Sequence, residues 1–130
     1  MRVIPGIEFN TFSITGRCSR TGMLGIAITT SDITVGSRCP YVKSSVGAVA
    51  TQASTDPGLG PFALNLLQLG YSASGALQQL EASDPHIERR QLAIVDHNGN
   101  AAARTGAMNN QWAGHITGKG HVTMGNGLVG

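Results

Sequence analysis

The sequence predicts an α+β layered domain, in which a mainly antiparallel pair of sheets carries two helices on one outer face. Strand-like segments come first, two helical segments occupy the middle of the chain, and strand-like segments return from Arg90 onward. A length of 130 residues suffices for one layered core and is short for two. We therefore expect a single domain over residues 11–130, preceded by an extension over residues 1–10 with little periodicity.

The first predicted strand, residues 11–15, alternates hydroxyl and apolar side chains with the period of two that strands show. Residues 23–30 predict a second strand, and the turn between the two segments indicates an antiparallel hairpin. Residues 31–40 are predicted to form a loop. In the first strand we expect two residues to point inward and three to share the other face, namely Phe12 and Ile14 against Thr11, Ser13 and Thr15.

An uncharged run of small side chains over residues 46–51 predicts a central strand that is covered on both sides. Pro61 suits the first turn of the helix that follows, because its missing N–H would have no partner there. Gly70 is expected to end this helix. Five residues make up the expected apolar stripe: Phe62, Ala63, Leu66, Leu67 and Leu69.

Ser72 is the predicted N-cap of a second helix, whose apolar positions recur at the spacing of one helical face before Pro85 stops it. Asn98-Gly99 between two apolar runs, residues 90–96 and 101–105, is a strong hairpin signal. A last strand pair is predicted near residues 112–117 and 121–124.

Composition narrows the classes of protein. Charged residues make up 12% of the chain and the net charge of +2 is scattered, which argues against nucleic acid as a partner. No apolar run approaches the roughly 20 residues needed to span a membrane, and the N-terminus lacks the apolar core of a signal peptide, so we expect a cytoplasmic protein. Metal-ligand spacings are missing from the sequence, and we expect neither metal nor other cofactor.

Several sequence blocks carry a family resemblance: TFSITG, TGMLGIAITTS, VGAVATQASTDPGLGP, RQLAIVDHNGNAAARTG and WAGHITGKG. In this order they resemble the bacterial domain of unknown function 1028 family, whose members are assigned to the Ntn-hydrolase superfamily. The resemblance implies a four-layer αββα sandwich. Ten residues precede Thr11, where family members usually start, and Asp32 stands where they often have lysine. Family members also continue past the position of Gly130, so this chain is expected to supply only part of the sandwich.

An Ntn hydrolase uses the hydroxyl or thiol of an N-terminal residue as nucleophile and the free amine of that residue as base. Thr11 is the family-matched candidate, and the Asn10–Thr11 bond suits self-cleavage. The alternative nucleophile is a residue that follows Gly130 on a second chain from the same precursor. In either case Asn126 is the candidate oxyanion donor. The simplest structural role for Thr11 is that of a strand threonine paired across the sheet.

We expect five residues to converge on one pocket at the sheet edge, namely Thr11, Ser13, Thr51, Gln52 and Asn126. Ser13, Thr51 and Gln52 are the expected substrate-binding residues of this group. His115 is a fourth candidate for substrate binding, although a lone histidine more commonly serves a hydrogen-bonded structural role.

The predicted function is that of an Ntn-type amidohydrolase that cleaves an amide bond of a small metabolite. The alternative is a non-catalytic small-molecule-binding or scaffold domain that keeps the fold. We also expect a second chain or a homo-oligomer to cover exposed sheet and helix faces, with Phe62, Leu66 and Leu69 in the core and not in that contact.

Overall fold

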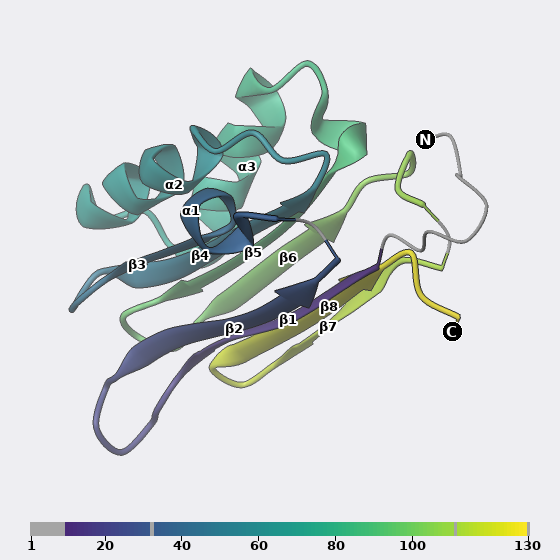
Figure 1. The fold of residues 1–130 in the computed structure, drawn as a ribbon. Helices are drawn as coiled ribbons and strands as arrows, with labels where there is room; N and C mark the ends of the chain where they lie inside the picture. Colours follow the sequence, from purple (N-terminus) through teal and green to yellow (C-terminus); the bar gives the residue numbers. More distant parts are fainter. Residues whose placement is uncertain (1–9, 32, 111, 130) are drawn as a thin grey trace.

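The computed structural model describes residues 10–31, 33–110 and 112–129, and in them two four-stranded antiparallel sheets lie against each other (Figure 1). The expected extension over residues 1–10, apart from Asn10, lies outside the described residues, as do Asp32 and Gly130. Sheets and helices are arranged as the sequence predicts for a mixed α+β domain.

The first sheet, here the β1 sheet, has the strand order β2-β1-β8-β7. Its strands are β1 (Thr11–Arg17), β2 (Leu24–Thr30), β7 (Gly114–Gly118) and β8 (His121–Asn126). The second, here the β4 sheet, has the order β3-β4-β5-β6. Its strands are β3 (Pro40–Lys43), β4 (Gly47–Ala53), β5 (Arg90–Asp96) and β6 (Ala101–Thr105).

Two helices, α2 (Leu59–Gln68) and α3 (Ala73–Ser83), cover the outer face of the β4 sheet (Figure 1). A short helix, α1 (Val35–Arg38), lies within the segment that was expected to be a loop, and a 3-10 turn, η1 (Ile87–Arg89), leads into β5. None of the helices in the described part of the chain is long and apolar enough to cross a membrane.

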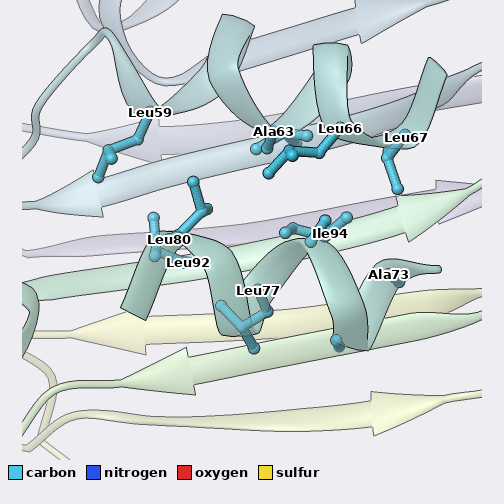
Figure 2. Close-up of a cluster of buried hydrophobic side chains, with 12 residues drawn as sticks. Leu59, Ala63, Leu66, Leu67, Ala73, Leu77, Leu80, Leu92 and Ile94 are labelled. Carbon is cyan, nitrogen blue, oxygen red and sulfur yellow. The ribbon is translucent and has the colours of Figure 1, made fainter. Parts of the chain in front are cut away.

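The larger hydrophobic core lies between the helices and the β4 sheet (Figure 2). Leu59, Ala63 and Leu66 of α2 lie at one helical face and pack with Leu92 and Ile94 of β5. The buried residues of α2 are Leu59, Gly60, Ala63, Leu66 and Leu67, which make a face centred near Ala63, and the flank of the expected stripe turns outward. The expectation that Phe62 and Leu69 lie in the core is therefore wrong, since they are 40% and 78% exposed.

Capping and turn chemistry follow the sequence closely. The Ser72 hydroxyl accepts a hydrogen bond from the Gly75 N–H at 3.1 Å and caps α3. Buried Asp96 then ties this helix to the β5–β6 hairpin. Its carboxylate accepts from the Ala73 N–H at 3.2 Å and from the Asn98 N–H at 3.0 Å. The helix layer and the hairpin are thus held together by one side chain.

The facing of β1 is opposite to the sequence prediction. Ser13 and Thr15 are buried between the sheets, whereas Phe12 and Ile14 are 56% and 46% exposed on the outer face. The alternation of side chains along a strand shows which residues share a face, but it does not show which of the two faces points inward. The hydroxyl face is inward here because Gln52, across the interface, accepts a hydrogen bond from the Ser13 hydroxyl at 2.8 Å.

Close packing between the backbones of Gly106 and Glu88 fixes the position of η1, the segment that leads into β5. A Cβ atom added at Gly106, just after β6, would overlap the backbone of Glu88 in η1. The Gly106 N–H also donates to the Arg90 carbonyl at 2.9 Å. Glycine at this position therefore lets η1 lie directly against the end of β6 and sets where Arg90 enters the sheet.

Gly106→Ala is expected to lower the free energy of unfolding by about 1–3 kcal/mol, because backbone cannot yield to the added methyl as a flexible side chain would. Gly25→Ala in β2 is the matched control, since a Cβ atom there meets nothing within 4 Å. The free energy of unfolding of Gly25→Ala, measured in urea, should stay within about 0.5 kcal/mol of that of the parent. Equal stability of the two variants would contradict the packing described.

Candidate functional site

A network of buried side-chain amides and hydroxyls joins the two sheets near the start of β1. Its centre is Gln91 on β5, which is 0% exposed. The Gln91 Oε1 accepts from Gln52 Nε2 at 2.7 Å and from Asn126 Nδ2 at 3.0 Å. Gln52 in turn accepts from the Ser13 hydroxyl. Two of the predicted site residues, Gln52 and Asn126, thus meet on one buried glutamine, and Ser13 is joined to it through Gln52.

The other end of the Gln91 amide fixes the far strands of both sheets. Its Nε2 lies 2.9 Å from the Gly114 carbonyl, 2.9 Å from the Gly125 carbonyl and 3.0 Å from the Thr105 hydroxyl. Two N–H groups serve three acceptors, so one hydrogen is shared. The Thr105 hydroxyl also pairs with His115 Nδ1 at 2.8 Å. His115 is exposed and joins the network only through this contact.

Gln91 is the residue that the sequence prediction missed. It pairs in register with Gln52, and directly opposite residues of antiparallel strands share a face. A glutamine inside an otherwise apolar strand must find hydrogen-bond partners when it is buried. The amide of Gln52 on the neighbouring strand was the signal in the sequence that could have identified this pair.

Thr11 lies at the start of β1, opposite one of its expected neighbours, Asn126. It is the register partner of Thr30 on one side and of Asn126 on the other, so these three side chains share a face. The Thr11 and Thr30 hydroxyl oxygens are 2.8 Å apart. The cross-strand pairing expected of a structural threonine is therefore present, and it leaves the hydroxyl at the wall of a cavity.

Thr51 does not join this group, and the expectation that five residues converge is wrong for it. Neighbouring residues of a strand point to opposite faces, so Thr51 faces the helix layer while Gln52 faces the β1 sheet. Thr51 is 0% exposed, and its hydroxyl has no hydrogen-bond partner among the described residues. A role in substrate binding would require a path through the helix layer.

The cavity beside Thr11 has a volume of about 290 Å³. Its walls come from the ends of β1, β2 and β4, from α1 and from the start of β5. Ala53, at the end of β4, has a φ of 70°, a left-handed conformation that is uncommon for alanine. This turn directs the chain along the cavity. The lining residues are Thr11, Thr30, Ile33, Val35, Arg38, Cys39, Gln52, Ala53, Ser54, Thr55 and Arg90.

The charged groups at the cavity are two arginines. Arg90 donates from Nε to Asp84 at 2.8 Å and from Nη1 to the Ser54 carbonyl at 2.7 Å. The hydrogen bond from Arg90 lowers the pKa of the Asp84 carboxyl below its usual value, so this pair stays ionised. Arg38 is exposed at the rim. Burial raises the pKa of nearby Tyr41, whose hydroxyl donates to the Arg38 carbonyl at 3.1 Å.

Within the described part of the chain, no three or more histidine, cysteine or acidic side chains lie close enough together to hold a metal ion. Amides, hydroxyls and guanidinium groups are the polar chemistry that the arrangement offers. Such groups bind neutral and anionic oxygens, and a hydroxyl at a cavity wall can act as a nucleophile when a base is beside it.

A solved structure supports the fold. The crystal structure of a protein from Silicibacter pomeroyi, which bears the same DUF1028 family name, matches with a TM-score of 0.89 and 32% sequence identity. The match covers 93% of this chain and 56% of that one, so this chain spans little more than half of its solved relative. No curated protein matches the sequence. The model of the family described as "Family of unknown function (DUF1028)" matches residues 11–130, and the chain belongs to that family.

Proposed function

We propose that the protein is an Ntn-type amidohydrolase that acts on a small molecule, with the Thr11 hydroxyl as its nucleophile. The observation that carries the proposal is the position of this hydroxyl. It lies at the wall of the 290 Å³ cavity, at the first residue of β1, 2.8 Å from the Thr30 hydroxyl. The Ntn mechanism places its nucleophile at the first residue of a chain, and removal of residues 1–10 would make Thr11 that residue.

The mechanism begins with self-cleavage. The Thr11 hydroxyl attacks the carbonyl carbon of Asn10, the Asn10–Thr11 C–N bond breaks, and the nitrogen takes up the hydroxyl proton. Water then hydrolyses the resulting ester. The products are a shortened upstream peptide that ends in the Asn10 carboxylate and a Thr11 residue with both a free amine and a free hydroxyl.

The mature reaction repeats this chemistry on substrate. The Thr11 amine accepts the hydroxyl proton while the oxygen attacks the substrate amide carbon, and the departing amine leaves with that proton. Water then hydrolyses the acyl ester. Asn126 is the register partner of Thr11 and is 7% exposed, and it is not one of the described residues that line the cavity. Its Nδ2 gives one N–H to Gln91, and the proposed oxyanion role requires the substrate oxygen to reach the second N–H beside Thr11.

The proposal includes a fourth layer on the outer face of the β1 sheet, as in an αββα sandwich. Phe12, Ile14 and Ile116 are exposed on this sheet, at 56%, 46% and 71%. A second, mostly apolar cavity lies along it beside Phe12 and Ile14. A sheet with apolar side chains on both faces is stable in water when both faces are covered. In an αββα sandwich, helices from a later part of the chain cover this face. For this chain we propose that a second copy of the protein covers the outer face of the β1 sheet.

A non-catalytic binding or scaffold domain is the second candidate. The observation that favours it is the cross-strand pairing of the Thr11 and Thr30 hydroxyls, whose oxygens are 2.8 Å apart, since such a pairing suits a structural threonine. Uncleaved, Thr11 has no free amine to act as base. A nucleophile that follows Gly130 on a second chain is the alternative to Thr11 within the hydrolase proposal.

Self-cleavage is tested by the intact mass of the purified protein. The parent chain should mature to a species that begins at Thr11, Thr11→Ser should still mature, and Thr11→Ala should not. Hydrolysis of a panel of small N-acyl aminocoumarin amides by Thr11→Ala should fall by about a thousandfold or more. Thr21→Ala is the control, because Thr21 is exposed in the turn between β1 and β2, at the other end of the strands, and lines neither cavity. An uncleaved parent with unchanged hydrolysis in Thr11→Ala would overturn the mechanism.

Association through the β1 sheet is tested by light scattering. The parent chain should be a dimer at micromolar concentration, and Phe12→Ser with Ile14→Ser should shift it to monomer because the apolar contact is lost. Phe62→Ser on α2 removes another exposed aromatic ring, 40% exposed against 56% for Phe12, from the other side of the molecule and should leave the dimer intact. A parent chain that stays monomeric at high concentration would show that no second copy covers this face.

A further inference from the structure

We propose that the cavity beside Thr11 recognises a carboxylate, so that its substrate is a small amide that also carries a carboxylate, such as an N-acyl amino acid. The proposal rests on the hydrolase function for the cleavage step, but the carboxylate site is argued from the cavity itself. The bond cleaved would be the amide C–N bond, and the reaction would consume one water and release a carboxylic acid and an amine.

The charge of the cavity wall is of one sign. Arg38 and Arg90 are the ionisable cations among the described lining residues, and no aspartate or glutamate is among those described residues. The positive charge of Arg90 is balanced by Asp84, which does not line the cavity and whose Oδ2 lies 2.8 Å from the Arg90 Nε. Arg38 has no ion pair with any residue in the described part of the chain. The described lining residues therefore carry about one unbalanced positive charge, which an anionic group of the substrate would neutralise.

Arg90 is pre-positioned for a second contact. Its guanidinium has five N–H groups, of which three point to Asp84 and to the Ser54 carbonyl. One N–H on each terminal nitrogen is left without an acceptor among the described residues. Because the Asp84 pair fixes the plane of the guanidinium, little side-chain freedom is lost when a ligand oxygen accepts these hydrogens.

Arg38 supplies the charge that is not already paired. It ends α1, directly before buried Cys39, and Tyr41 holds its carbonyl through the hydroxyl. Its side chain is exposed at the rim, where a carboxylate can enter from solvent. Guanidinium groups bind carboxylates through parallel N–H donors, which gives both strength and orientation.

Size and polarity fit the same class of ligand. A volume of about 290 Å³ lies at the lower end of the range of about 300–1,000 Å³ that is typical of small-molecule pockets. The hydroxyls of Thr11, Thr30 and Thr55 stand on the same lining as the arginines. A carboxylate at the arginines would therefore leave the rest of a short ligand within the hydroxyl-lined part of the cavity, where Thr11 lies.

The test uses N-acetylglycine and its uncharged counterpart N-acetylglycinamide as probes, with binding to the parent chain followed by NMR chemical shifts. N-acetylglycine should bind at least about tenfold more tightly, since a hydrogen bond between charged groups is involved. Arg38→Gln should abolish this preference. Arg20→Gln is the control, because Arg20 is an exposed arginine in the turn between β1 and β2 at the other end of the strands, and it should keep the preference.

Equal binding of the two probes to the parent, the same preference in Arg38→Gln, or no saturable binding of either probe would each overturn the inference. The same NMR samples report cleavage through the appearance of free acetate. Binding of N-acetylglycine that depends on Arg38 without acetate release supports the carboxylate site and counts against the hydrolase. Acetate release from both probes at equal rates supports the hydrolase and overturns the carboxylate site.

Discussion

The hydrogen bonding of the buried Gln91 amide is the constraint on which the rest of the site depends. Its oxygen and nitrogen contact groups from β4, β6, β7 and β8, so the two sheets share one polar anchor at this end of the sandwich. A buried polar group without its partner costs about 1–3 kcal/mol, and a fully satisfied network defines a unique arrangement. Relative sliding of the sheets would break several of these bonds together.

That anchor places the start of β1. Ser13, two residues along β1 from Thr11, donates a hydrogen bond to Gln52. Asn126, the residue directly opposite Thr11 on β8, donates to Gln91. The Thr11 hydroxyl is thereby held at the cavity wall by neighbours that are themselves fixed. On the other wall, the contact between Gly106 and Glu88 and the Asp84–Arg90 pair set the position of Arg90. Rigid strands hold the residues that the proposed chemistry uses.

Local patterns predicted much of the fold. The Asn98-Gly99 turn, the Ser72 cap and the apolar spacing of α3 are determined by residues close in sequence, and each was predicted at its observed position. The facing of β1 was not predictable from alternation, because the inward position of Ser13 depends on Gln52, 39 residues away. The expected stripe on α2 was broader than the buried face, which is centred near Ala63, so Phe62 and Leu69 on its flank are exposed.

The site was predictable in part for the same reason. Ser13, Gln52 and Asn126 were expected together and are joined, but through Gln91, whose role appears only when β4 and β5 pair. Thr51 and Gln52 are neighbours in one strand and cannot share a face, so strand alternation already excluded one of the two. Arg38 and Arg90 enter the cavity from segments whose conformation depends on tertiary contacts, which no local pattern specifies.

The most direct test of this account is the hydrogen exchange of side-chain amides measured by NMR. The amide protons of Gln52, Gln91 and Asn126 should exchange as slowly as the backbone amides of β4 and β5, because opening them requires the two sheets to part. The exposed Gln68 and Gln78 supply the fast reference. Exchange of Gln91 as fast as that of Gln78 would contradict the claim that its amide anchors the two sheets.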